Sequence, residues 1–149
     1  MTAIRIDLYS DTSTRPTPPM REFMAAAPVG DEQMREDPTV NQLVAMVCEL
    51  LGTEDAMFLP SGSMCNQIAI RVHCRPGDEI IMDETAHTRN FEVGGAAALT
   101  GATIYALSGQ RGIFTADQVE AAIRPAIHHA PRSRLLQVEQ TSNLGGGAI

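Results

Sequence analysis

The chain has 149 residues, of which 44% are hydrophobic and 19% are charged, a composition typical of a soluble globular domain or of a piece of a larger one. The net charge is −7, and the basic residues form no stripe along the sequence. Both features argue against a nucleic-acid partner and against an anionic membrane surface. Because no apolar run is long enough to cross a bilayer and the first residues lack a secretory signal pattern, we expect a cytoplasmic protein.

The basic residues of the chain are all of one kind. All eleven are arginine, and no lysine occurs anywhere in the sequence.

The chain has no group of histidine, cysteine or carboxylate residues at the spacing of metal ligands. His128 and His129 are adjacent, so their rings cannot easily converge on one ion, and no cysteine or carboxylate stands at ligand spacing from them. We therefore predict no metal centre.

The first clear element in chain order is a helix over residues 37–51. Asp37 is a good helix cap, and apolar residues recur at helical spacing until Gly52 ends the pattern. Residues 1–36 are predicted to form an amino-terminal arm and a short helix. Residues 37–149 are predicted to form the first part of a larger domain.

Beyond that helix, helical patterns alternate with short apolar runs at the spacing of β-α-β units. Four strands separated by three helices predict an α/β fold, with a mostly parallel sheet and helices on both faces. In such sheets, ligands bind beyond the carboxyl ends of the strands. The expected strands cover residues 56–60, 79–83, 102–107 and 135–139, and the expected helices between them cover residues 64–74, 86–99 and 115–124.

Three segments at that sheet edge carry groups suited to chemistry. Ser61, Gly62 and Ser63 connect a strand to a helix, where N–H groups and hydroxyls favour a phosphate, although small residues also simply make tight turns. His87 follows the second strand and is either a catalytic group or a capping or surface residue. Glu139 ends the fourth strand, where its plainer interpretation is a carboxylate that accepts hydrogen bonds from nearby N–H groups.

Six segments occur in a fixed order along almost the whole chain. They are Ser10-Asp11-Thr12 with Thr14-Arg15-Pro16-Thr17-Pro18, Gly30-Asp31, Glu36-Asp37-Pro38-Thr39-Val40-Asn41, Pro60-Ser61-Gly62-Ser63-Met64, Ala86-His87 with Glu92 and Gly94-Gly95-Ala96-Ala97, and Glu139 with Thr141 and Asn143. Each segment alone is modest, but together and in this order the chain resembles the low-specificity L-threonine aldolases.

That resemblance implies the aspartate-aminotransferase-like fold and the cofactor pyridoxal 5'-phosphate (PLP), with this chain as the amino-terminal part of the large cofactor-binding domain. It implies that residues 61–63 hold the PLP phosphate. His87 would stack on the cofactor ring and move protons, so it is the expected catalytic residue. Ser10 would help to grip the substrate carboxylate, and Glu92 would lie on the substrate side of the pocket.

The resemblance also implies an activity and an assembly. The whole protein would cleave a β-hydroxy-α-amino acid such as L-threonine to glycine and an aldehyde, as a homodimer or a homotetramer. Three kinds of family residue would follow the last residue of this chain: the lysine that holds PLP as a Schiff base, an aspartate at the pyridinium nitrogen, and arginines at the substrate carboxylate. We therefore expect the chain by itself to be inactive.

Three positions depart from the family pattern. Met34 and Phe91 stand where many members have tyrosine, and Ser142 stands where some have a second histidine. These departures leave the substrate open, including β-hydroxy amino acids with bulkier side chains. Two other functions also stay open: a PLP-dependent β-eliminating lyase on the same fold, and a non-catalytic α/β binding module.

Overall fold

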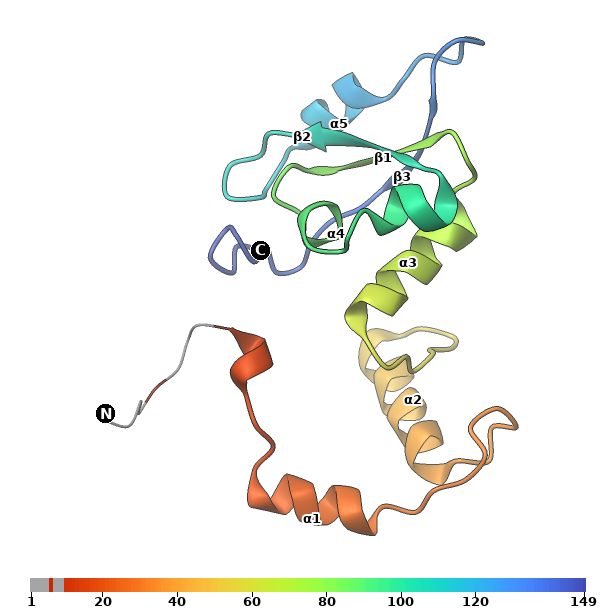
Figure 1. The fold of residues 1–149 in the computed structure, drawn as a ribbon, viewed down its shortest axis with the longest axis vertical. Helices are drawn as coiled ribbons and strands as arrows, with labels where there is room; N and C mark the ends of the chain where they lie inside the picture. The colour runs from red at the N-terminus through yellow and green to blue at the C-terminus, as the bar shows by residue number, and fades with distance from the viewer. Residues whose placement is uncertain (1–5, 7–9) are drawn as a thin grey trace. The chain divides into compact units, whose positions relative to one another are not determined.

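The computed structural model describes Ile6 and residues 10–149, which divide into two compact units, Met1–Phe58 and Leu59–Ile149. Figure 1 shows the helices of the first unit and the small sheet of the second. The expected division after residue 36 concerns the domains of the whole protein and stays a prediction.

The first unit contains a 3-10 turn, η1 (Asp11–Ser13), and two helices, α1 (Pro18–Ala26) and α2 (Pro38–Leu51). The predicted helix over residues 37–51 is confirmed. The Asp37 carboxylate caps α2 by accepting a hydrogen bond from the Val40 N–H at 2.8 Å, and it also accepts one from the N–H of Gly30, in the preceding loop, at 3.0 Å. These bonds hold the pKa of Asp37 below its usual value. Gly52 ends the helix with a φ of 67°, a backbone conformation that favours glycine.

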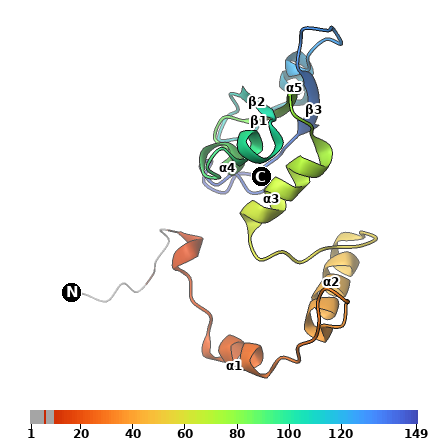
Figure 2. The same cartoon turned by 45° about the vertical axis from the view of Figure 1, so that its right-hand side comes forward.

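The second unit is built on a parallel three-stranded sheet with the order β2-β1-β3. The strands are β1 (Asp78–Asp83), β2 (Thr103–Leu107) and β3 (Arg132–Leu136). The helices are α3 (Gly62–His73), α4 (His87–Asn90), the π-helix η2 (Ala96–Thr100) and α5 (Ala116–Ala122). Figure 2 shows these elements from a second direction.

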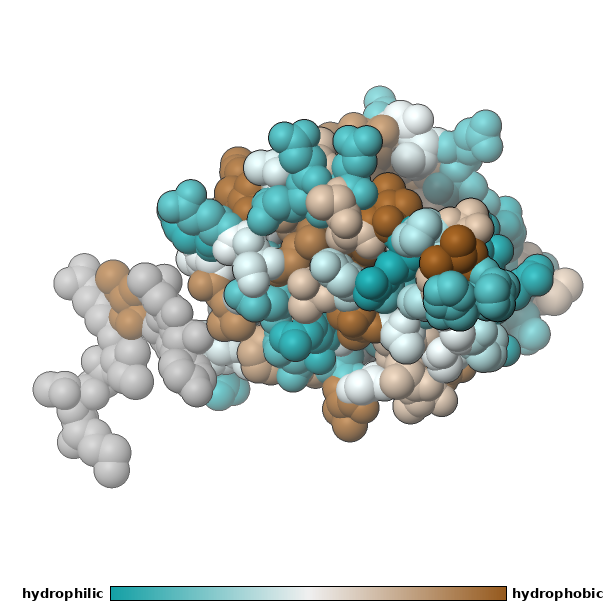
Figure 3. Space-filling model, turned by 90° about the horizontal axis from the view of Figure 1, so that it is seen from above, coloured by the Kyte–Doolittle hydropathy of each residue, from teal (hydrophilic) through white to brown (hydrophobic). Residues whose placement is uncertain are grey.

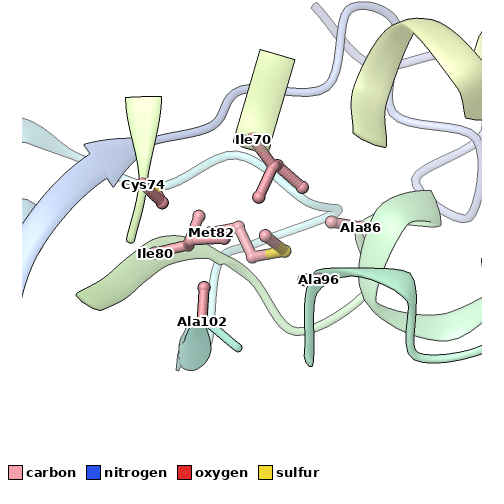
Figure 4. Close-up of a cluster of buried hydrophobic side chains, with 7 residues drawn as sticks. All are labelled: Ile70, Cys74, Ile80, Met82, Ala86, Ala96 and Ala102. Carbon is pink, nitrogen blue, oxygen red and sulfur yellow. The ribbon is translucent and has the colours of Figure 1, made fainter. Parts of the chain in front are cut away.

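The core of this unit lies on both faces of β1, whose six residues are all buried. On one face, Ile80 and Met82 pack with residues from α3, η2 and the loops, as Figure 4 shows. On the other face, Ile81 packs with Leu107 and with Ala122 of α5. The predicted α/β architecture, a parallel sheet covered on both faces, is confirmed.

Three predicted elements were placed wrongly. Residues 56–60 form no strand, because no strand in the described part of the chain pairs with them, and an unpaired apolar segment gains no ladder hydrogen bonds. The helix expected over residues 86–99 is broken into α4 and η2, because Val93 and Gly94 have φ values of 55° and 68° and cannot continue a helix.

The last strand begins at Arg132, three residues before the expected start at 135. Its first residue pairs with Asp78 of β1 both in the strand register and through the Arg132 guanidinium, whose Nε and Nη2 each lie 2.9 Å from a carboxylate oxygen. This charged beginning has no local signal, because the partner of the arginine is 54 residues away in the sequence.

The surface carries both polar and apolar side chains. Figure 3 shows one face of the molecule, on which apolar residues lie scattered among polar ones. Among the described residues, no helix is long and apolar enough to cross a membrane.

Candidate functional site

The site is built first from the beginning of α3. Ser61 precedes the helix in an extended conformation, and its hydroxyl accepts a hydrogen bond from the Met64 N–H at 3.2 Å. Apart from its chain neighbours and the backbone of its own helix, no atom lies within 4 Å of the position that a Cβ on Gly62 would occupy, so the backbone is open there. The first turn of a twelve-residue helix presents N–H groups and the positive end of the helix dipole, which together favour an anion.

Glu92 lies buried beside the second turn of α3, with 1% of its side chain exposed. Its Oε1 accepts a hydrogen bond from Asn66 Nδ2, and its Oε2 accepts one from Gln67 Nε2, each at 2.7 Å. His87 Nδ1 lies 3.1 Å from Oε1. We call Glu92, Asn66 and Gln67 the carboxylate clamp.

His87 begins α4 and is held along one edge of its ring by the clamp. The side chain is 45% exposed, and none of the described residues hydrogen-bonds to its Nε2. The Phe91 ring lies beside the imidazole, with a centroid separation of 5.4 Å and an interplanar angle of 45°. The ring is therefore fixed at Nδ1 and on one side, while nearly half of the side chain is accessible.

These contacts bring together several of the predicted site residues. Ser63, Asn66 and Gln67 share one side of α3, because residues three and four apart are neighbours on a helix. Asn66 in turn shares the Glu92 Oε1 atom with His87. His87, Glu92 and the turn 61–63 therefore gather around the first two turns of α3.

Two other predicted residues belong to other segments of the chain. Ser10 belongs to the first compact unit, where its hydroxyl lies 2.8 Å from Thr12 Oγ1, and its contact with a substrate stays a prediction. Glu139 follows β3 and is half-buried. The hydrogen bonds expected to its carboxylate are not formed by the described part of the chain.

The sequence reasoning missed Asn66 and Gln67. Their signal was a pair of amides between Met64 and Ile68 in a helix expected to cover the sheet. An amide pair in such a helix needs partners, and Glu92 supplies them.

Asp83 was also missed, although it is the last residue of β1 and only 4% exposed. Its Oδ1 accepts hydrogen bonds from the Thr85 hydroxyl at 2.6 Å and N–H at 2.8 Å, and its Oδ2 accepts one from the Gly109 N–H at 2.9 Å. Burial alone would raise the pKa of this carboxyl, but the bonds from Thr85 and Gly109 bring the pKa below its usual value.

Ser142 is buried and connects two loops near that edge. Its hydroxyl accepts a hydrogen bond from the Gly145 N–H at 3.2 Å, and it packs so closely on Gly112 that a Cβ at that glycine would overlap it. Arg111 Nε donates to the Gly145 carbonyl at 2.9 Å. Ser142 therefore fastens the loop 108–113 to the loop 140–148.

Comparisons with known proteins concern the family and the fold of the chain. The sequence model of the beta-eliminating lyase family matches residues 7–149. The chain is 44% identical over 139 residues to low specificity L-threonine aldolase of Escherichia coli, covering 93% of this chain and 42% of that protein. It is 40% identical over 155 residues to probable low-specificity L-threonine aldolase 2 of Arabidopsis thaliana, covering 99% of this chain and 43% of that protein.

The fold resembles that of a solved structure of Leishmania major threonine aldolase, with a TM-score of 0.72 and 22% sequence identity over 88% of this chain and 39% of that one. The chain spans less than half the length of each of these three proteins. The match of the family model over nearly all its residues shows that the chain belongs to the beta-eliminating lyase family.

Proposed function

We propose that the whole protein is a PLP-dependent enzyme that cleaves a β-hydroxy-α-amino acid such as L-threonine to glycine and an aldehyde. The observation that carries the proposal is the clamped imidazole of His87, which Glu92 connects to Asn66 and Gln67 of α3 and whose Nε2 is unused by the described residues. The relatives named threonine aldolases support this choice of reaction.

The residues at the beginning of α3 fit the phosphate of PLP. Ser61 and Ser63 supply hydroxyls, and the open backbone at Gly62 allows a group to approach the N–H groups of the first turn. We propose that these three residues hold the phosphate and that the His87 ring packs on the cofactor ring. When bound, PLP would withdraw electrons from the substrate α-carbon.

The protein groups would then orient the substrate and move a proton. His87 Nε2 accepts the proton of the substrate β-hydroxyl while the Cα–Cβ bond breaks, so the β-carbon leaves as an aldehyde. The remaining carbon gains a proton to give glycine. We propose that Ser10 contacts the substrate carboxylate, and the substrate contact expected for Glu92 stays a prediction. A cytoplasmic location and a homodimer or homotetramer are further proposals from the family resemblance.

A second candidate is β-elimination, which the description of the matching family favours. The two reactions yield different products from one substrate. Incubating the whole PLP-loaded protein with L-threonine, L-allo-threonine and β-phenylserine should release glycine and the matching aldehyde. Release of ammonia and a keto acid without glycine would instead establish β-elimination.

The role of His87 is tested in the same assay with His87→Phe, which keeps a flat ring but cannot carry a proton. We expect the variant to bind PLP and to lose turnover by roughly 10²-fold or more, the usual contribution of a general base. The control is His128→Phe, which replaces an exposed histidine outside the site. Full turnover in His87→Phe would contradict the proton-transfer role.

A further inference from the structure

We infer that Glu92 is a positioning residue that fixes the His87 imidazole in the tautomer protonated at Nδ1 and leaves Nε2 as the proton acceptor. The use of Nε2 rests on the proposed function, whereas the tautomer is a property of the described residues themselves. The inference concerns how the chain prepares the imidazole, and it gives Glu92 a role that needs no contact with the substrate.

The first step is the charge of Glu92. Asn66 and Gln67 each direct an amide nitrogen at a different carboxylate oxygen, at 2.7 Å. Two donors on two oxygens match an ionised carboxylate, which only accepts hydrogen bonds. Among the described residues, His87 is the one ion-pair partner of Glu92, so the negative charge of this buried group is directed to the imidazole.

The second step concerns the ring. A nitrogen lone pair facing a carboxylate oxygen would be repelled, so the nitrogen 3.1 Å from Oε1 must carry its hydrogen and donate it. In a neutral imidazole only one nitrogen is protonated, and hydrogen bonding at one ring nitrogen selects the state of the other. Donation by Nδ1 therefore leaves Nε2 with a free lone pair. A positive charge that forms on the ring would be stabilised by the same carboxylate.

The third step concerns the backbone strain in the residues that follow Glu92. The next residue, Val93, is 99% exposed and has a φ of 55°, a left-handed conformation that is rare for a β-branched residue. Gly94 then turns the chain, with a φ of 68°, toward the π-helix η2. Strained residues and π-helical turns concentrate at functional sites, which fits a backbone arranged to bury this carboxylate.

The Gln67 amide leaves one of its own polar atoms without a hydrogen bond within the described part of the chain. Its Oε1 is buried and has no hydrogen-bond partner among the described residues, because its Nε2 is committed to Glu92. This arrangement makes a specific prediction for Glu92→Gln. The new amide oxygen can occupy the Oε1 position and serve Asn66 and His87, while its nitrogen donates to Gln67 Oε1 after that amide flips. The variant should therefore keep the tautomer without the charge.

The test is the ¹⁵N spectrum of the whole protein labelled in its histidine imidazoles, with the His87 signals identified by their loss in His87→Phe. At a pH where the ring is neutral, Nδ1 should give a protonated-type signal and Nε2 an unprotonated one. Glu92→Leu should lose this preference, and Glu92→Gln should restore it. Glu120→Gln, which changes an exposed carboxylate on α5, should leave the spectrum unaltered.

A protonated Nε2 in the unaltered protein would overturn the inference, and so would an unchanged tautomer in Glu92→Leu. If that variant fails to fold, the unaltered protein and Glu92→Gln still decide the question. Turnover separates the inference from the proposed function, because Glu92→Leu should lower kcat by roughly 10-fold or more if His87 moves the proton. The expected tautomer together with full turnover in His87→Phe would support the inference and reject the proton-transfer role of His87, whereas release of ammonia and a keto acid without glycine would reject the proposed reaction and leave the tautomer unaffected.

Discussion

Gly95 shows how closely single residues are fitted around the carboxylate clamp. Its φ of −54° and ψ of −39° are ordinary helical values, so its backbone does not require glycine. The neighbouring side chains do require glycine here. A Cβ at this position would lie 2.5 Å from Cδ of Gln67, whose amide nitrogen donates a hydrogen bond to Glu92. Gly95 is therefore needed for space, which links a small residue in the chain to the orientation of His87.

We expect Gly95→Ala to destabilise the protein. Without the contact to Gln67, the change would stabilise by about 0.4–1 kcal/mol, because alanine restricts the unfolded chain. The overlap should reverse the sign and cost about 1–3 kcal/mol, the usual penalty for overpacking a filled site. Urea unfolding followed by circular dichroism measures the difference. The control is Ala97→Ser, which adds one atom at an exposed neighbouring position, and a stabilised Gly95→Ala would contradict the fit described here.

For single residues, the sequence predicted candidate site residues but not all of their hydrogen-bond partners. The turn 61–63 and His87 were predicted from their places after strands, and Glu92 from the family resemblance. In the structure, His87 and Asn66 of α3 both contact Glu92 Oε1. Asn66 and Gln67 were not predicted, because their role depends on a carboxylate that lies 26 and 25 residues, respectively, further along the chain. Hydrogen bonds over such separations have no periodicity that the sequence displays.

Among the elements, β1 carries acidic residues at both ends of a fully buried strand. The hydrogen bonds of the Arg132 guanidinium to Asp78 lower the pKa of that carboxyl. At the other end, burial opposes ionisation of Asp83, but the bonds from Thr85 and Gly109 lower its pKa in total. Both folded-state pKa values therefore lie below the unfolded value for aspartate, which is about 3.9.

A lowered carboxyl pKa makes stability depend on pH in a defined direction. The stabilisation is complete above about pH 5, where nearly all of the unfolded carboxyls are ionised, and it is lost as the pH falls through the unfolded and then the lower folded-state pKa values. The urea midpoint should therefore fall between pH 5 and pH 2. Asp83→Asn should be less stable than the unaltered protein at pH 7 and should lose less stability on acidification.

The control for this measurement is Asp117→Asn, which changes an exposed carboxyl on α5 and should keep the pH dependence of the unaltered protein. An identical acid dependence in Asp83→Asn and the unaltered protein would show that Asp83 makes no such contribution.

Elements with local signals were predicted well, and elements defined by distant partners were not. Helix α2 was predicted from its cap, its apolar spacing and its terminal glycine, all within a few residues of it. In α5, Thr115 and Gln118 form the capping box that the sequence indicated. The segment 56–60 has an apolar composition but no strand beside it in the described residues, and β3 begins at an arginine whose carboxylate partner lies on β1.

For the whole molecule, the absence of lysine from the 149 residues leads to a direct prediction. A side-chain amine is needed to attach PLP covalently, and the arginine guanidinium stays protonated and cannot replace it. We expect the 149-residue chain, treated with PLP and then borohydride, to show no cofactor fixed to an internal residue. Mass spectrometry of its peptides measures this. The whole protein treated in the same way is the positive control, and a fixed cofactor within residues 2–149 of the shorter chain would contradict the prediction.

The sequence separation between the carboxylates of β1 and their arginine partners also affects the order in which the chain can fold during synthesis. Asp78 lies 54 residues before Arg132, and Glu79 lies 45 residues before Arg124, which contacts its carboxylate at 3.0 Å and 3.2 Å. A ribosome adds about 5–20 residues per second, so roughly 3–11 s pass between the synthesis of Asp78 and that of its partner. Early in this interval the nascent chain has the apolar residues of β1 but lacks Arg124 and Arg132, which pair with the two carboxylates in the folded chain. Because unpaired charges oppose burial, we expect β1, the central strand of the sheet, to become fully packed only after β3 has been made.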